Sequence, residues 1–123
     1  MKKTIFVVDD IAAKEQMSGQ TAQPSLDTKY AKGFIRTMNK HITRLAEILA
    51  KNGKYDNSDL LTYSINNLAI KDALAGVGEL ELSKVAEKLE QAGMEKNIDI
   101  ISSETPGFLD ALRFIISKYT NAY

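Results

Sequence analysis

Residues 66–93 read NNLAIKDALAGVGELELSKVAEKLEQAG and decide the fold. Apolar residues recur in this stretch at intervals of three and four, which is the period of one helix face. The Gly-Val-Gly at 76–78 interrupts the pattern, and Gly93 closes it, because glycine is the usual residue just after a helix. The stretch therefore predicts the end of one helix and the whole of the next, from roughly Glu79 to Ala92.

The helical pattern also extends upstream of this stretch. Apolar residues at helix spacing predict a first helix that begins near Asp27 and stops at Asn52-Gly53. Asn57 or Ser58 can cap a second helix, because short polar side chains accept hydrogen bonds from free backbone N–H groups at helix starts. This second helix is expected to reach Gly76 or Gly78.

Downstream, Thr105-Pro106 predicts the start of a fourth helix, with threonine as the cap and proline at the first helical position. Residues 95–103 then form a short turn or extend the third helix. Four amphipathic helices with short connections predict an all-α fold, an antiparallel up-down four-helix bundle over residues 27–123.

The first 26 residues form an N-terminal extension with a different pattern. Residues 4–8, Thr-Ile-Phe-Val-Val, are β-branched and aromatic, which indicates a strand. A polar segment with Gly19 and Pro24 follows it. One strand alone cannot form a sheet. We therefore expect it to pair with another chain, to pack on the helices, or to stay mobile.

Composition excludes several classes of function. The 123 residues include no cysteine and one histidine, His41, which excludes disulfides and multi-histidine metal sites; we expect no metal and no cofactor. Lys and Arg balance Asp and Glu at 16 each, so no global field attracts nucleic acid or a membrane surface. No window approaches the roughly 20 apolar residues that span a bilayer. We expect a soluble, cytoplasmic protein.

The second helix carries two apolar stripes on a helical wheel. The first is broad enough to face the core and comprises Leu60, Tyr63, Ile70, Ala73, Leu74 and Val77. The second comprises Leu61, Ile65 and Leu68, and it is continued or flanked by Lys71, Asp72 and Ala75. An edge helix needs only one stripe. The second is therefore packed against the N-terminal residues Ile5, Phe6 and Val8, covered by a second copy, docked by another protein, or left as scattered exposed residues.

The order of helices and the residues 68–79, LAIKDALAGVGE, resemble the histidine phosphotransfer (HPt) family of two-component signalling. The segment TPGFLDALRFI, residues 105–115, resembles the last helix of that family. The resemblance covers residues 27–120 and implies a four-helix bundle. It implies a response-regulator receiver or a histidine kinase as partner.

The resemblance also implies that phosphotransfer is lost. Leu68 stands where the family has its phosphate-accepting histidine, and leucine has no nucleophile. Lys71 stands where a family lysine neutralises the phosphoryl group. Asp72 replaces a small residue and adds negative charge where the anion would lie. We expect no catalytic residue and no enzymatic activity.

The opening residues MKKTIFVVDD resemble the first strand of a receiver domain, whose acidic pair binds magnesium. The rest of a receiver has no room before residue 27. We interpret residues 1–26 as a possible receiver remnant, and Asp9-Asp10 as a weak metal site at most.

Three hypotheses for function follow from the sequence. The first is a non-catalytic HPt-like domain that binds its partner through Leu61, Ile65, Leu68, Lys71, Asp72 and Ala75. The second is an active phosphotransfer protein that uses His41, which requires His41 to be exposed beside Lys71. The third is a structural module that forms a homodimer.

Overall fold

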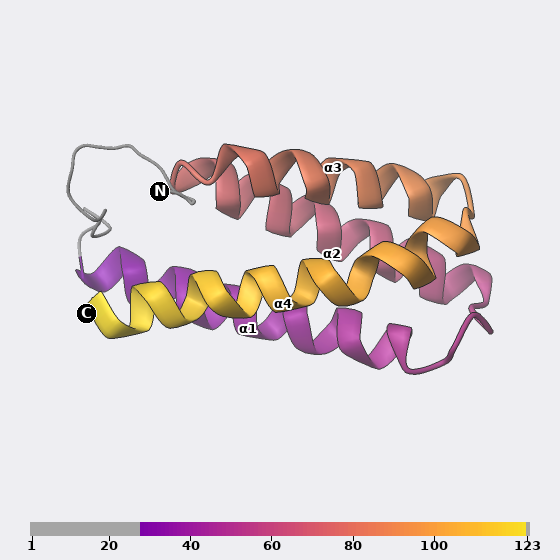
Figure 1. Cartoon of the computed structure of the whole chain (residues 1–123), viewed down its shortest axis with the longest axis horizontal. Coiled ribbons are helices and arrows are strands. Elements are labelled where there is room, and N and C mark those ends of the chain that lie inside the picture. Colours follow the sequence, from indigo (N-terminus) through magenta and orange to yellow (C-terminus); the bar gives the residue numbers. More distant parts are fainter. Residues whose placement is uncertain (1–27, 123) are drawn as a thin grey trace.

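The computed structural model describes residues 28–122, and Figure 1 shows their arrangement as a helical bundle. Its helices are α1 (Thr28–Leu49), α2 (Asn57–Gly76), α3 (Leu80–Met94) and α4 (Ile98–Ala122). Successive helices run antiparallel, so the predicted all-α four-helix bundle is confirmed. The predictions for the first 26 residues, including the strand at 4–8 and the acidic pair Asp9-Asp10, lie outside the described residues.

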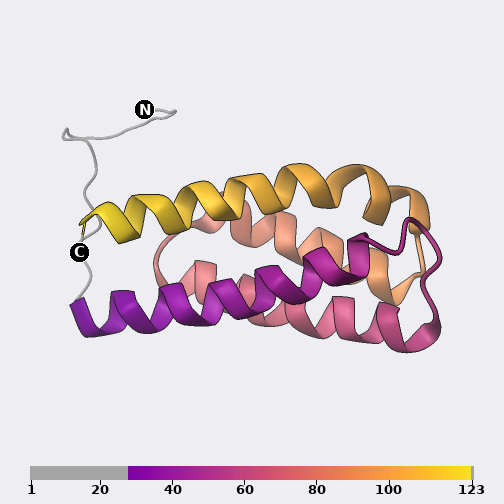
Figure 2. The same cartoon turned by 90° about the horizontal axis from the view of Figure 1, so that it is seen from below.

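Each helix packs against two others, and together they surround one core. α1 and α3 each contact both α2 and α4, as the two views in Figures 1 and 2 agree. The apolar stripe expected on α1 is buried, with Met38 and Leu45 fully enclosed. Phe34 on this stripe meets Tyr119 of α4, with ring centroids 5.1 Å apart. Burial of these amphipathic faces, rather than helix propensity, accounts for most of the stability of such helices.

α2 and α3 approach each other closely because small residues line their contact. Gly93 lies against Ser64 and Tyr63 of α2, with no room for a Cβ atom. The Ser64 hydroxyl donates to the backbone oxygen of Glu90 at 2.9 Å, and the Ser83 hydroxyl donates to that of Lys71 at 3.0 Å. Gly93 therefore serves close packing. Its predicted role as the end of α3 is wrong, since the helix continues to Met94.

The prediction that α4 begins at Thr105-Pro106 is wrong, because the helix begins at Ile98. Asn97 precedes it, and the Asn97 side-chain oxygen accepts the backbone N–H of Ile100 at 3.2 Å, which is a capping contact. Thr105 is fully buried inside the helix, and Pro106 is internal. An internal proline removes one helix hydrogen bond and bends the axis, and Figure 1 shows α4 bending in its N-terminal third.

The start of α2 also differs from the prediction. Its cap is Asp56, one residue before Asn57, and the predicted caps Asn57 and Ser58 lie inside the helix. The Asp56 side chain accepts the backbone N–H of Asp59 at 2.8 Å, and the Asp59 side chain accepts that of Asp56 at 3.0 Å. This reciprocal capping box satisfies donors that a helix start leaves free. It fixes where α2 begins.

Candidate partner-binding face on helix α2

The predicted second stripe of α2 lies on the surface. Leu61 is 63% exposed, Ile65 56% and Leu68 40%. The opposite side of the helix is buried in the core through Leu60, Tyr63, Ile70 and Leu74. We refer to Leu61, Ile65 and Leu68 as the α2 stripe. No described residue buries it, and its predicted packing against Ile5, Phe6 and Val8 lies outside the described residues.

Charged residues follow the stripe toward the end of α2. Lys71 is directed to α3, where its Nζ lies 3.6 Å from Oε1 of Glu90, and both side chains are largely covered. Asp72 and Ala75 are exposed, and Asp72 has no ion pair among residues 28–122. The six predicted site residues thus share one region, but the Lys71 charge is already balanced by a carboxylate.

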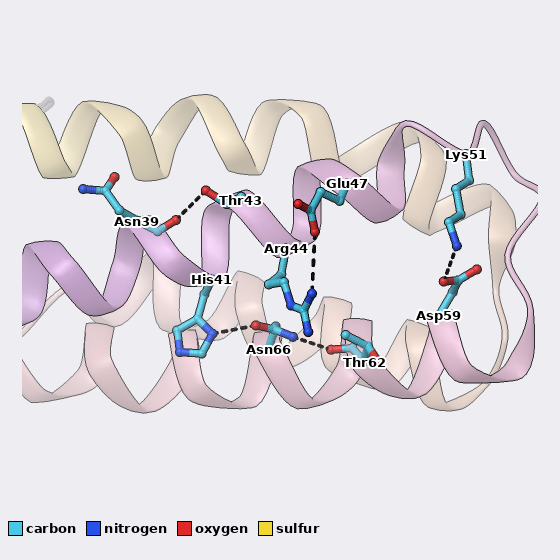
Figure 3. Close-up of polar contacts among 9 residues, drawn as sticks. All are labelled: Asn39, His41, Thr43, Arg44, Glu47, Lys51, Asp59, Thr62 and Asn66. Carbon is cyan, nitrogen blue, oxygen red and sulfur yellow. Dashed lines mark hydrogen bonds and ion pairs between the residues drawn. The ribbon is translucent and has the colours of Figure 1, made fainter.

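His41 belongs to α1 and contacts the flank of α2 that faces α1. Its Nδ1 is 2.6 Å from Oδ1 of the buried Asn66, and the Asn66 amide donates to the backbone oxygen of Thr62 at 2.8 Å (Figure 3). Because Asn66 presents its oxygen, the histidine Nδ1 carries the proton in this contact. His41 is half-buried where α1 meets α2, whereas Lys71 reaches α3. The two side chains are therefore on opposite flanks of α2, not beside each other.

The chemistry available on this face is limited. Its exposed apolar residues carry no nucleophile, and no cluster of three or more metal-binding side chains occurs in residues 28–122. No helix of this described part is long and apolar enough to cross a membrane. The face is suited to contact with apolar surface on another molecule, since exposed apolar patches with polar borders mark interaction sites.

Sequence reasoning missed a second surface feature, an open groove of about 540 Å³ between α1 and α2. Its lining residues are Lys29, Tyr30, Gly33, Phe34, Arg36, Thr37 and Ala73. The only signal in the sequence is Gly33 between two aromatic residues, where a missing side chain leaves a hollow beside them. That signal needs the position of Ala73 on the neighbouring helix before it indicates a groove.

The described residues thus form a four-helix all-α domain with an exposed apolar stripe on α2 and an open groove between α1 and α2. No protein-family model, no curated protein and no solved structure matches this chain.

Proposed function

We propose that this chain is a degenerate HPt-like domain that binds a receiver domain or a histidine kinase, or a second copy of itself, without transferring phosphate. The observation that carries the proposal is the exposure of Leu68 together with Leu61 and Ile65. The resemblance assigns the phosphate-accepting histidine of the family to position 68. An apolar residue is therefore presented at the position where the family presents its nucleophile.

Two further features argue against phosphate handling at this surface. Lys71 is paired with Glu90, so its charge is not available to an incoming phosphoryl group without breaking that contact. Asp72 is exposed next to it and would repel an anion. Both features weaken anion binding, whereas neither weakens apolar docking on the stripe.

The α2 stripe supports docking energetically. Complete burial of one Leu or Ile side chain contributes about 1.5–3 kcal/mol. The stripe residues are only partly exposed, so three of them supply a few kcal/mol in total, before the cost of association is subtracted. This favours a weak or transient partner complex. Such complexes are common in signalling.

A phosphotransfer assay tests the non-catalytic part of the proposal. The protein is incubated with phosphorylated receiver domains from the same organism, and acid-labile phosphate on the protein is measured. We expect none. Appearance of acid-labile phosphate on the chain would overturn the proposal, and its loss in His41→Gln would assign the transfer to His41.

A matched pair of variants tests the docking part. Ile65→Asp places a charge at the centre of the stripe, whereas Phe114→Asp changes a 70% exposed aromatic residue on α4. Both side chains point to solvent, so neither substitution is expected to unfold the bundle. We expect Ile65→Asp alone to abolish binding to receivers or kinases in a pull-down. Equal binding by both variants would contradict the assigned face.

Self-association is tested separately by sedimentation of the full chain. A dimer that Ile65→Asp dissociates and Phe114→Asp does not would assign the stripe to a second copy. A monomer in all three samples leaves the receiver or the kinase as the partner class.

A further inference from the structure

The groove between α1 and α2 has an apolar interior and a cationic edge. Phe34, Gly33 and Ala73 contribute its apolar part, and Arg36 and Lys29 contribute the charge. No acidic side chain lines it. The groove and the α2 stripe are different surfaces, because no residue of the stripe lines the groove.

Tyr30 shapes one part of this groove. It projects from the first turns of α1 and is 49% exposed, although it is a large aromatic residue. Its hydroxyl lies where it would be only 3.1 Å from a Cβ at position 76, so the glycine there leaves room for it. The Tyr30 ring thus bridges α1 and the last turn of α2, and it leaves apolar surface uncovered on the groove side.

Two cationic side chains on this stretch of α1 are not balanced by a described carboxylate, and one of them, Arg36, lies at the edge of the groove. Lys32 and Arg36 are exposed on α1, and neither has an ion pair among residues 28–122. A peptide segment with an apolar run followed directly by carboxylates would complement both the apolar interior of the groove and its cationic edge. Residues 5–10 of this chain have that order, Ile-Phe-Val-Val followed by Asp-Asp.

We propose that the N-terminal residues 5–10 of this same chain occupy the groove, with the apolar run against Phe34 and Ala73 and the two carboxylates beside Arg36. This inference goes beyond the proposed function and does not depend on it.

The connection between the segment and the groove permits this placement. The described chain begins at Thr28, directly before the groove residues Lys29 and Tyr30. Residues 11–27 join the segment to α1, and a random-coil connection of that length would span on average about 20–25 Å. The groove extends along α1 over residues 29–37, about 12 Å at the helical rise. A short tether also holds the segment at a millimolar effective concentration, so a weak contact is sufficient.

The absence of cysteine in the chain makes a spin-label test direct. A nitroxide is attached to the full chain at Thr4→Cys, next to the apolar run, and amide signals are recorded by NMR. We expect the amides of Gly33, Thr37 and Ala73 to lose intensity. Those of Lys51 and Asp59, at the other end of α1 and the start of α2, should keep it.

Three variants of the labelled chain identify the contacts. Phe6→Ser should restore the groove signals by removing apolar contact. Arg36→Glu should restore them by repulsion, and adding Asp9→Lys with Asp10→Lys to Arg36→Glu should again reduce them. Arg36 is exposed, so these charge changes leave the core intact.

Other occupancies give distinct results, and each overturns the inference. Intensity losses at Leu61, Ile65 and Leu68 would put the segment on the α2 stripe. If the amides of the groove residues lose intensity only when a spin-labelled chain is mixed with a separate isotope-labelled chain, the occupant is a second copy. No loss at either surface would leave the groove to a different molecule.

Discussion

The Tyr63 hydroxyl lies 2.7 Å from the Thr105 hydroxyl and joins α2 to α4 across the core of the bundle. The two helices are diagonal partners, and no Cα atoms of the pair approach within 8 Å. Both residues are buried, at 1% and 0% exposure. A buried hydroxyl without a partner is costly, so each of these groups makes the burial of the other tolerable.

The protein is expected to lose stability above pH 10 through Tyr63. Burial raises the pKa of Tyr63 to about 12, despite the hydrogen bond with Thr105, which lowers it. The unfolded chain loses the phenol proton near pH 10, whereas the folded chain retains it. The stability contributed by the neutral phenol is therefore complete below pH 10 and is lost as the pH rises to about 12, by roughly 2–3 kcal/mol. Urea unfolding at a series of pH values measures this loss.

Tyr63→Phe is the control for this pH dependence, because it keeps the ring and removes the ionising group. It should cost about 1–3 kcal/mol at neutral pH, because the buried Thr105 hydroxyl loses its hydrogen-bond partner. It should also flatten the fall in stability between pH 10 and 12 relative to the unsubstituted chain. An equally steep fall in Tyr63→Phe would assign the effect to other titrating groups.

Gly93→Ala is expected to destabilise the protein, although alanine is the better helix former. A Cβ at position 93 would clash with the Ser64 hydroxyl and lie 2.9 Å from Cδ2 of Tyr63, so α2 and α3 would have to separate. Overpacking of this kind costs about 1–3 kcal/mol. The urea midpoint should fall accordingly.

Gly107→Ala is the matched control. Gly107 lies in α4, is exposed, and has no atom within 4 Å of its Cβ position. The same substitution should there stabilise the protein by about 0.5–1 kcal/mol through helix propensity. If Gly93→Ala and Gly107→Ala change stability in the same direction, the close approach of α2 and α3 does not explain why position 93 requires glycine.

The sequence predicted most of the helices because the spacing of their apolar residues reflects which side of each helix is buried in the bundle. For the same reason it placed Leu61, Ile65 and Leu68 on a different side of the second helix from the core-facing stripe, with their exposure as one of several alternatives. It failed at Thr105-Pro106, where a strong local signal for a helix start is overridden by tertiary packing. Thr105 is buried against Tyr63, and Asn97 supplies the cap. The groove was also missed, because it depends on residues of α1 and Ala73 of α2 lining the same hollow.

Lys51→Met is expected to raise the pKa of Asp59. The hydrogen bond from Lys51, at 2.7 Å, is the main cause that lowers the pKa of Asp59, and the backbone N–H of Asp56 adds to it. A lowered carboxyl pKa contributes stability that is present above the unfolded pKa and is lost as the pH falls through the folded one. NMR titration of Asp59 measures the change. An unaltered pKa in Lys51→Met would mean that the Asp56 contact alone sets it.

The descent implied by the resemblance can be tested by restoring the missing chemistry. Leu68→His with Asp72→Ser places an imidazole at a position that is 40% exposed in the unsubstituted chain and removes the adjacent negative charge. Lys71 lies one helical turn from position 68 and keeps its contact with Glu90 unless a phosphoryl group displaces it. We expect the double variant to acquire acid-labile phosphate from a phosphorylated receiver domain.

Leu61→His with Asp72→Ser is the matched control, because Leu61 is even more exposed, at 63%, and lies on the same stripe. The residue one helical turn beyond it is the buried Ser64, so no lysine supports a phosphoryl group there. Docking geometry and the nearby Lys71 favour position 68, and exposure alone favours position 61. Phosphate on the position 68 variant only would support an HPt-like docking surface in its original register. Equal labelling at both positions, or greater labelling at position 61, would show that any exposed imidazole suffices, and the resemblance would then no longer support the proposed partner.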